Sequence, residues 1–190
     1  MTTTLKLKPI VHLNREQFAQ LCQANPEARL ELTQIGELVV MPPTGGETGD
    51  RNDEISFQLR AWNKLTLSGK TFDSSTGFNL PNGATRSPDA SWVSLTCWNA
   101  LTEEERKGFP PLCPDFVVEL RSSSDNLKAL RDKMQEYIDN GTQLGWLIDP
   151  IRKIVEIYRT GQQPEVLPNP IQLSGENVLP GFVLDLESIF

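Results

Sequence analysis

The chain has 190 residues, 38% of them hydrophobic and 23% charged, and its formal net charge is −7 at pH 7. These values are typical of one soluble globular domain that buries a substantial core. Non-specific nucleic-acid binding is driven by Lys and Arg side chains that neutralise phosphates. The acidic balance therefore argues against a simple DNA-binding module, and any nucleic-acid contact must use a local basic strip, be brief or depend on metal ions.

Other classes of protein are excluded by what the sequence lacks. No apolar run approaches the roughly 18–20 residues of a membrane-spanning helix, and residues 1–10 have neither the apolar stretch nor the cleavage site of a secretory signal. The three cysteines have no CxxC spacing and His12 is the only histidine, which argues against a zinc site. A reducing, cytoplasmic location is the simplest interpretation of the scattered, odd-numbered cysteines.

The N-terminal part of the chain predicts a helix and a β-hairpin. After a start that is either disordered or an edge strand, Asn14 and Gln17 have the spacing of a capping box and begin a short helix, which Pro26 ends. Residues 29–33 and 37–41 alternate between apolar and polar side chains, and the short connection between them predicts a hairpin.

The rest of the chain alternates between predicted helices and strands. A helix is expected at about 47–67, capped by Thr48 or Asp50, because its apolar residues recur three and four apart. The later expected elements are strands at 71–79 and about 87–94, a short helical segment at 97–107, a strand at 115–121, a helix that the cluster 122–125 opens and that runs through Tyr137 or Asn140, and strands at 144–149 and 154–158.

This order of elements predicts one mixed α/β domain over residues 1–190, with a central sheet flanked by helices. Within it, the helix and hairpin of residues 1–45 are an attachment to a core at 46–160. Further strands at 161–190 follow the core.

Two acidic residues occupy predicted apolar strands, where burial of a carboxylate costs free energy. Asp89 follows Pro88 at the start of an apolar strand, and Glu119 lies inside Phe-Val-Val-Glu-Leu, whose apolar residues predict burial on both faces. A buried glutamate is destabilising unless it is paired or binds a metal. Carboxylate oxygens are the ligands that hard ions such as Mg²⁺ or Mn²⁺ prefer. Asp89 and Glu119 are therefore candidate metal ligands.

Arg121 leaves two interpretations open. It lies two residues after Glu119 on the same predicted strand, so both side chains point to the same face. A cation at this place could stabilise negative charge or orient a water molecule beside a metal site. The alternative is a structural ion pair between Glu119 and Arg121, with Asp89 acting only as a strand cap.

The same residues carry a resemblance to a known family. Pro88-Asp89 followed by Glu119-Leu120-Arg121 resembles the PD-(D/E)XK signature of restriction-type nucleases, with arginine in the place of the lysine. Over about residues 10–190 the chain resembles, in matching order, a family of uncharacterised endonucleases of that superfamily that is expanded in cyanobacteria and assigned chiefly by fold. The segments that carry this wider match are 31–32, 36–41, 86–89, 114–122, 133–137 and 145–150.

The resemblance implies a restriction-endonuclease-like fold and further metal ligands. In that superfamily a carboxylate on the helix before the core sheet often completes the metal site, which makes Glu54 a candidate beside Asp89 and Glu119. Glu31, in the first hairpin, matches the family's hairpin acid and could approach the site instead. The ordinary interpretation of Glu54 is a solvated residue on a helix face.

The resemblance also implies roles for the basic residues. The superfamily's lysine positions or activates the attacking water, whereas arginine keeps its proton and is a poor base. Arg121 would then stabilise charge, and Lys133, on the following helix, could supply the missing ammonium group. Together with Lys128 and Arg131 these two cations form a basic strip that could follow a phosphate backbone or simply be a solvated face.

The resulting hypothesis is a Mg²⁺- or Mn²⁺-dependent endonuclease that acts on DNA rather than RNA. Related nucleases often pair to cut two strands, so analogy favours a homodimer. A catalytically inactive binding or assembly module on the same fold is the main alternative, and the acidic balance and Arg121 favour it. A hydrolase of nucleotides has less support, because Gly45-Gly46 lacks the Lys-Ser/Thr of a phosphate-binding loop.

Overall fold

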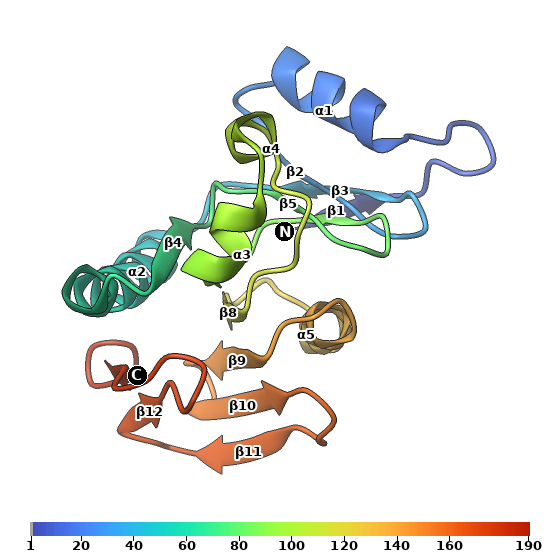
Figure 1. Cartoon of the computed structure of the whole chain (residues 1–190). Coiled ribbons are helices and arrows are strands. Elements are labelled where there is room, and N and C mark those ends of the chain that lie inside the picture. Colours follow the sequence, from blue (N-terminus) through green and yellow to red (C-terminus); the bar gives the residue numbers. More distant parts are fainter. Residues whose placement is uncertain (1) are drawn as a thin grey trace.

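The computed structural model describes residues 2–190, which form one large sheet and two smaller ones (Figure 1). The central sheet has the strand order β11 (Glu165–Pro168), β10 (Ile154–Arg159), β9 (Leu144–Asp149), β8 (Phe116–Leu120), β7 (Ala90–Ser94) and β4 (Gly69–Asp73). The second sheet has the order β1 (Thr3–Leu5), β3 (Leu38–Met41), β2 (Arg29–Leu32), β6 (Thr85–Arg86) and β5 (Phe78–Asn79). The strands β12 (Gln172–Ser174) and β13 (Val183–Asp185) form the third sheet. In the central sheet β8 and β9 are parallel and their outer neighbours antiparallel, so the sheet is mixed.

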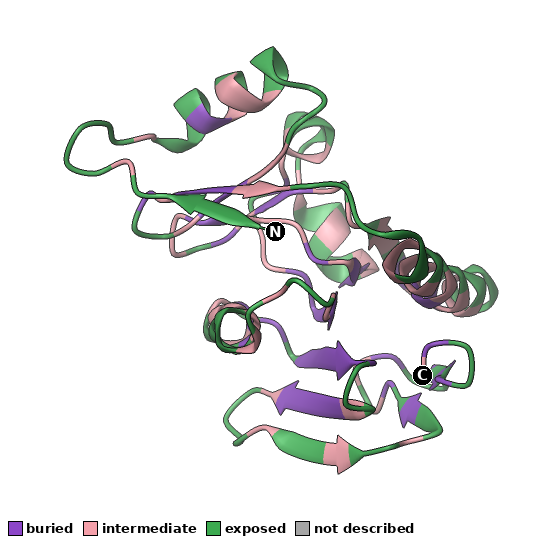
Figure 2. Ribbon diagram, turned by 180° about the vertical axis from the view of Figure 1, so that it is seen from behind, coloured by how far each residue is buried: buried purple, intermediate pink, exposed green. Residues whose placement is uncertain are grey.

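Helices cover both faces of the central sheet. The long helix α2 (Gly46–Thr66) and α5 (Leu127–Asp139) lie on opposite sides of it (Figure 1). Ile55 of α2 packs with Phe116 and the other core-facing residues of β8, whereas Tyr137 of α5 packs with Val117 on the opposite face. This agrees with the alternation of side chains along a strand. Figure 2 shows that the buried residues concentrate on these central strands.

Three shorter helices complete the domain. The helix α1 (Arg15–Ala24) covers the second sheet through the fully buried Phe18. Between β7 and β8 the chain forms α3 (Leu95–Ala100) and α4 (Glu103–Lys107), so the helical segment expected at 97–107 is two helices instead of one. None of the described helices is long and apolar enough to cross a membrane.

The predicted architecture, a mixed α/β domain with a central sheet between helices, is confirmed. Asn14 and Gln17 form the expected capping box, and the hairpin at 29–33 and 37–41 is present as β2 and β3. The strand at 115–121 is β8, which is buried at every position. These predictions depend on residues that are close in sequence, where periodicity and capping are informative.

The predicted strands at 71–79 and 87–94 are confirmed only in part, as β4 and β5 and as β7, because the chain changes sheets in both places. Residues 71–79 are divided between β4 in the central sheet and β5 in the second sheet, with a turn in which Ser75 N–H donates to Asp73 Oδ1 at 2.9 Å. The chain then returns from β6 to β7 across residues 87–89. The second sheet thus combines β1–β3 with β5 and β6, which lie beyond residue 45.

Two predicted helix starts are also wrong. No side chain caps α2, which follows Gly45, so Thr48 and Asp50 lie inside the helix. The helix α5 begins after Asn126, whose side chain accepts hydrogen bonds from the first turn. The cluster 122–125 instead forms its own turn before α5, closed by hydrogen bonds of 2.9 and 2.7 Å to one carboxylate oxygen. The chain therefore stays extended for longer after β8, and this turn becomes part of a cavity wall.

Candidate active site

Asp89 and Glu119 lie close together where β7 begins beside β8. The strands β7 and β8 are antiparallel with Ala90 opposite Val118, and Asp89, directly before β7, and Glu119, inside β8, are the residues next to this pair. The negative charge of Asp89 contributes to the raised pKa of Glu119, as expected for neighbouring acids. Leu120 N–H donates to Asp89 Oδ2 at 2.8 Å, which holds this carboxylate against β8. The structure therefore brings the two predicted acids together.

Lys133 is the cation that faces these acids. Its Nζ lies 2.8 Å from Glu119 Oε1 and 2.9 Å from Glu31 Oε1, and its side chain is 12% exposed. Burial alone would lower the pKa of Lys133, but the charges of Glu119 and Glu31 outweigh burial and raise the pKa above its usual value. Lys133 therefore remains an ammonium ion and cannot serve as a base.

Glu31 is brought to the site by the first hairpin. Its Oε1 accepts from Ser87 N–H at 2.9 Å in addition to Lys133, and its Oε2 is 3.0 Å from Arg86 Nη1. Burial would raise the pKa of Glu31, but Lys133 and Arg86 together lower it, so the group is a carboxylate. Both of its oxygens are thus committed to protein donors. Glu31 orients Lys133 and Arg86, and it has little capacity left to bind a metal.

Glu119 is as buried as Glu31, but fewer donors stabilise its charged form. It is 3% exposed. Desolvation raises the pKa of Glu119 to about 8 although Lys133 acts in the opposite direction, and the negative charges of Asp89 and Glu31 add to the rise. Desolvation likewise raises the pKa of Asp89. The local negative charge therefore exceeds what Lys133 balances, and an additional cation would stabilise the ionised form of both acids.

The oxygens with spare capacity suit a hard divalent ion. Glu119 Oε1 accepts from Tyr137 Oη at 3.0 Å as well as from Lys133, whereas no donor within residues 2–190 reaches its Oε2. Asp89 Oδ1 accepts only a long bond of 3.4 Å from Asn52 Nδ2, and Asn52 Oδ1 is buried without a hydrogen-bond partner. The set is two carboxylates and one amide oxygen, which fits Mg²⁺ or Mn²⁺.

This donor set has fewer acids than the sequence led us to expect. Among residues 2–190 no group of three or more His, Cys, Asp or Glu side chains is arranged to hold a metal ion. Mg²⁺ is nevertheless commonly bound through one or two carboxylates, with waters and substrate phosphates as the other ligands. Two acids with an amide are therefore sufficient for such a site.

Arg121 and Glu54 lie away from this group. Arg121 Nη1 pairs with Asp149 Oδ2 at 2.8 Å, so the alternative ion pair between Glu119 and Arg121 does not form. Glu54 accepts from Gln58 Nε2 at 2.8 Å, and Gln58 in turn bonds to the backbone of Asp185. Two residues along a helix turn the side chain by about 200°, so Asn52 rather than Glu54 faces Asp89.

The predicted basic strip is not a free positive surface. Lys128 pairs with Asp132 at 2.6 Å, and Arg131 Nε donates to Glu156 Oε1 at 2.9 Å. Since Arg121 and Lys133 are paired as well, each member of the strip is matched by an acid. These four residues therefore do not form a track for a phosphate backbone.

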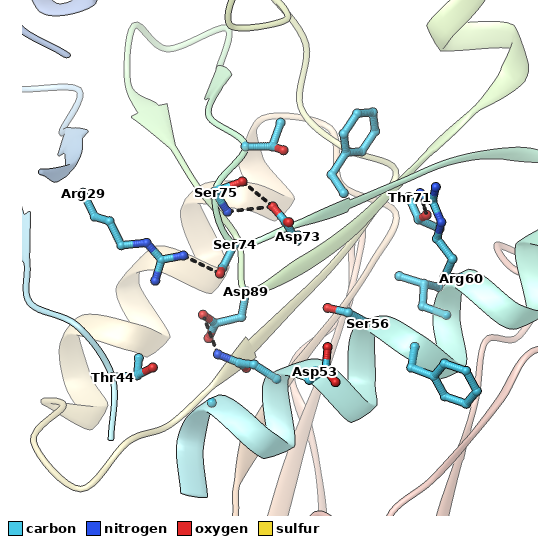
Figure 3. Close-up of a pocket in the computed structure, with 16 residues that line it drawn as sticks. Arg29, Thr44, Asp53, Ser56, Arg60, Thr71, Asp73, Ser74, Ser75 and Asp89 are labelled. Atoms are coloured by element: carbon cyan, nitrogen blue, oxygen red, sulfur yellow. Dashed lines mark hydrogen bonds between the residues drawn. The ribbon is translucent and has the colours of Figure 1, made fainter. Parts of the chain in front are cut away.

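Asp89 lies where two cavities meet. The first, of about 980 Å³, is bordered by the buried charges around Lys133 and by the turn before α5, and we call it the α5 arm. The second, of about 820 Å³, runs between one face of α2 and the segment from Thr71 to Thr76, and we call it the α2 arm (Figure 3). Arg29, Thr44 and Asp89 border both. The two arms are thus neighbouring parts of one cleft region with Asp89 in the wall of both, and Glu119 borders the α5 arm.

Several residues of the site were not predicted from the sequence. Asn52 stands among other polar helix residues, and only the tertiary structure separates it from its neighbours. Arg86 and Glu136 form an ion pair of 2.6 Å behind Glu31, and Tyr137 was named only as a possible end of its helix. Arg86, Glu136 and Tyr137 lie in segments that carry the family resemblance, which is the one signal that could have drawn attention to them.

The fold and the acid pair together define a restriction-endonuclease-like protein. A solved structure described as "a putative nuclease belonging to DUF820 from Anabaena variabilis ATCC 29413" superposes with a TM-score of 0.72 and 21% identity, over 86% of this chain and 90% of that chain. At this level of identity the likeness shows the fold. The chain belongs to the Uma2 family, described as "Putative restriction endonuclease", whose model matches residues 15–187. No match was found among curated proteins. The predicted membership of this superfamily is confirmed.

Proposed function

We propose that the chain is a metal-dependent nuclease that hydrolyses phosphodiester bonds in DNA, with Mg²⁺ or Mn²⁺ bound by Asp89 and Glu119. The observation that carries this proposal is the pair of neighbouring acids, with Asp89 held against β8 by Leu120 N–H beside Glu119. Lys133 is the single cation in contact with Glu119 among the described residues. Membership of a family described as restriction endonucleases favours DNA over RNA.

In this proposal some residues hold a divalent ion and another stabilises the negative charge that develops on the phosphate. A divalent ion, when bound, polarises the scissile phosphate and lowers the pKa of a water molecule. Asp89 and Glu119 would hold it through the oxygens that the protein leaves free, and Asn52 Oδ1 is the third donor. Leu120 N–H and Tyr137 Oη keep the two carboxylates in place through their other oxygens.

Lys133 takes the role that the sequence pattern assigns to the residue two after Glu119. Arg121 occupies that position but points to Asp149, whereas Lys133 reaches the same carboxylate from α5. Because its pKa is raised, the ammonium group would stabilise negative charge that grows on the phosphate oxygens. Activation of the water is then left to the bound ion.

A catalytically inactive binding module is the second candidate. The observation that favours it is the ion pair between Lys133 and Glu119 itself, since an acid that is already paired can be purely structural. Buried clusters of this kind do occur without catalytic function. Metal binding separates the two candidates.

The proposal is tested by cleavage of plasmid, single-stranded DNA and RNA in Mg²⁺ and in Mn²⁺. Asp89→Asn and Glu119→Gln should each reduce cleavage by more than about 100-fold, the upper range for residues that only support metal ligands. Glu54→Gln is the matched control, because it makes the same change outside the cleft, and it should cleave like the wild type. Equal cleavage by wild type and Glu119→Gln would contradict the proposal. Absence of both cleavage and a Mn²⁺-dependent thermal shift would favour the inactive module.

A further inference from the structure

The α2 arm contains an aromatic side chain in an unusual place. Phe57 is 65% exposed and borders this cavity together with Asn52, Ser56 and Arg60 of the same helix. Single exposed apolar residues are common on protein surfaces. Phe57 differs from those because it borders a cleft that leads to Asp89 and has an arginine three residues away. Residues three apart are neighbours on a helix surface.

Two arginines of the α2 arm form no salt bridge within residues 2–190, although the charge of Arg29 helps to lower the pKa of the nearby Asp73. Arg29 Nη2 donates to Ser74 Oγ at 2.5 Å, and Arg60 Nη1 donates to Thr71 Oγ1 at 3.2 Å. A hydroxyl group orients a guanidinium but leaves its charge available to a ligand. Figure 3 shows both arginines approaching the cavity, Arg29 from the hairpin and Arg60 from α2.

We propose that the α2 arm binds a single nucleic-acid strand next to the reacting phosphate, with an unpaired base stacked on Phe57 and phosphates near Arg60 and Arg29. This inference rests on the proposed function and adds the form of the substrate. From Asn52, beside Asp89, to Arg60 the helix spans about 12 Å. That exceeds the rise of about 3.4 Å per phosphate along the axis of a duplex for one strand, so the helix is long enough to contact more than one nucleotide.

The acids of the α2 arm explain why stacking should dominate binding. Asp53 and Asp73 also border the cavity. The hydrogen bond from Ser75 lowers the pKa of Asp73, outweighing burial, so this group stays charged. These charges oppose phosphate, and the net charge of the whole chain is −7. Affinity in this arm should therefore depend on the uncharged contact with Phe57 more than it would in a basic groove.

The geometry favours a single strand over a duplex for a physical reason. Both faces of a base inside a duplex are covered by its stacked neighbours, so an aromatic side chain can stack only on a base that is unpaired or turned out. Stacking tolerates all four bases because each has a π face. The arm should therefore bind without strong sequence preference.

The test measures binding of a short fluorescein-labelled oligonucleotide of mixed sequence, single-stranded and as a duplex, by anisotropy in EDTA so that no cleavage occurs. Phe57→Ala should weaken single-strand binding by about tenfold, the scale of losing one stacked base, and Phe57→Trp should retain it. Duplex binding should change less than about twofold. Arg60→Gln should reduce the slope of log affinity against log salt by about 0.7, the value for one phosphate contact on a single strand.

Matched controls lie on the same helix. Leu65 is 87% exposed, and neither it nor Lys64 borders the cleft, so Leu65→Ala and Lys64→Gln should bind like the wild type. Equal weakening by Leu65→Ala, or an unchanged affinity in Phe57→Ala, overturns the inference. Conversion of a dimer to a monomer by Phe57→Ala in light scattering would also overturn it, because the arm would then be a protein interface.

Hydrolysis of bis(p-nitrophenyl) phosphate separates this inference from the proposed function. That small diester has no flanking nucleotides that could extend along the α2 arm, so Asp89→Asn should abolish its hydrolysis while Phe57→Ala leaves it unchanged. Loss of diester hydrolysis in Phe57→Ala would count against a role confined to substrate binding. If wild type hydrolyses the diester and Phe57→Ala binds single strands normally, the inference fails and the proposed function stands. If wild type cleaves neither nucleic acid nor the diester, the proposed function fails, and the anisotropy result still decides strand binding.

Discussion

The two arms of the cleft use charged residues in opposite ways. In the α5 arm the side chains of Glu31, Arg86 and Lys133 are 2%, 12% and 12% exposed, and each forms at least one salt bridge. In the α2 arm Arg60 is exposed, and Arg29 and Arg60 meet hydroxyl groups instead of acids. Asp89 belongs to both arms and is partly buried.

This difference indicates that the α5 arm is suited to catalysis and the α2 arm to substrate binding. Buried charges interact strongly because water does not screen them, and their mutual pairing fixes their orientation. Exposed charges are screened and adjust to a ligand, so they contribute more to approach and affinity than to a fixed geometry. Substitutions in the α5 arm should therefore change the rate of reaction, and substitutions in the α2 arm should change binding.

The largest effect on rate after loss of a metal ligand is expected at Lys133. Lys133→Gln should lower cleavage by about 10²–10³-fold, the range for removing one group that stabilises transition-state charge. Measured well above pH 8, where Glu119 is ionised, it should not weaken Mn²⁺ binding, because it removes a cation that competes for Glu119. At lower pH binding should weaken, because Lys133 lowers the pKa of Glu119 and its loss makes that carboxyl group harder to ionise. Cleavage kinetics and Mn²⁺ calorimetry measure the two effects.

The control for this substitution is Lys128→Gln, on the same helix but 83% exposed. It should behave like the wild type in both measurements. Thermal unfolding of Lys133→Gln checks that the variant is folded. A parallel loss of Mn²⁺ affinity and rate well above pH 8 in a folded Lys133→Gln would mean that Lys133 builds the metal site, and the division between the arms would be wrong.

The second effect is a dependence of metal binding on pH. Because burial raises the pKa of Glu119 to about 8, the group is largely protonated at pH 6 and must lose its proton to bind a metal. Apparent Mn²⁺ affinity should therefore rise about tenfold per pH unit up to about pH 8, or about 100-fold from pH 6, and level off above it. Calorimetry in buffers of different ionisation enthalpy would also detect the released proton. A flat profile between pH 6 and 8 would show that Glu119 is already ionised or is not a ligand.

A smaller effect on rate is expected at Glu31. Glu31→Gln should reduce cleavage by about 10–100-fold, the range for a residue that supports another, because Lys133 and Arg86 lose a shared anchor. Mn²⁺ affinity should change less than about twofold, in contrast to Glu119→Gln. Loss of Mn²⁺ binding in Glu31→Gln would instead restore Glu31 as a metal ligand.

The smallest effect on activity is expected at Arg121. Its partner Asp149 lies outside both arms, so Arg121→Gln should leave cleavage within about twofold of the wild type. The free energy of unfolding should nevertheless fall by about 1–3 kcal/mol, because the buried carboxylate of Asp149 loses a donor. Urea unfolding measures the second quantity. A large loss of cleavage without loss of stability would return Arg121 to the site.

Some site residues could be predicted from the segment around them. The others depend on contacts with residues that are far away in the sequence. Asp89 and Glu119 could be proposed because each stands out against its own strand, and a buried glutamate is informative wherever it occurs. Arg121 directly follows β8 instead of lying inside it, and its partner comes from the end of β9. On α2 the residue in contact with Asp89 is Asn52 instead of Glu54, because the rotation of that helix about its axis is set by what it packs against.

The sequence by itself determined the alternation of helices and strands, the burial of β8 and the family resemblance, since periodicity, capping and hydrophobic pattern are local properties. Only the tertiary structure decided that Lys133 contacts Glu119, that Glu31 is saturated by protein donors, and that unpaired arginines border α2 instead of α5. Those contacts depend on the register between strands and on the side of the sheet that each helix covers, which no short segment encodes.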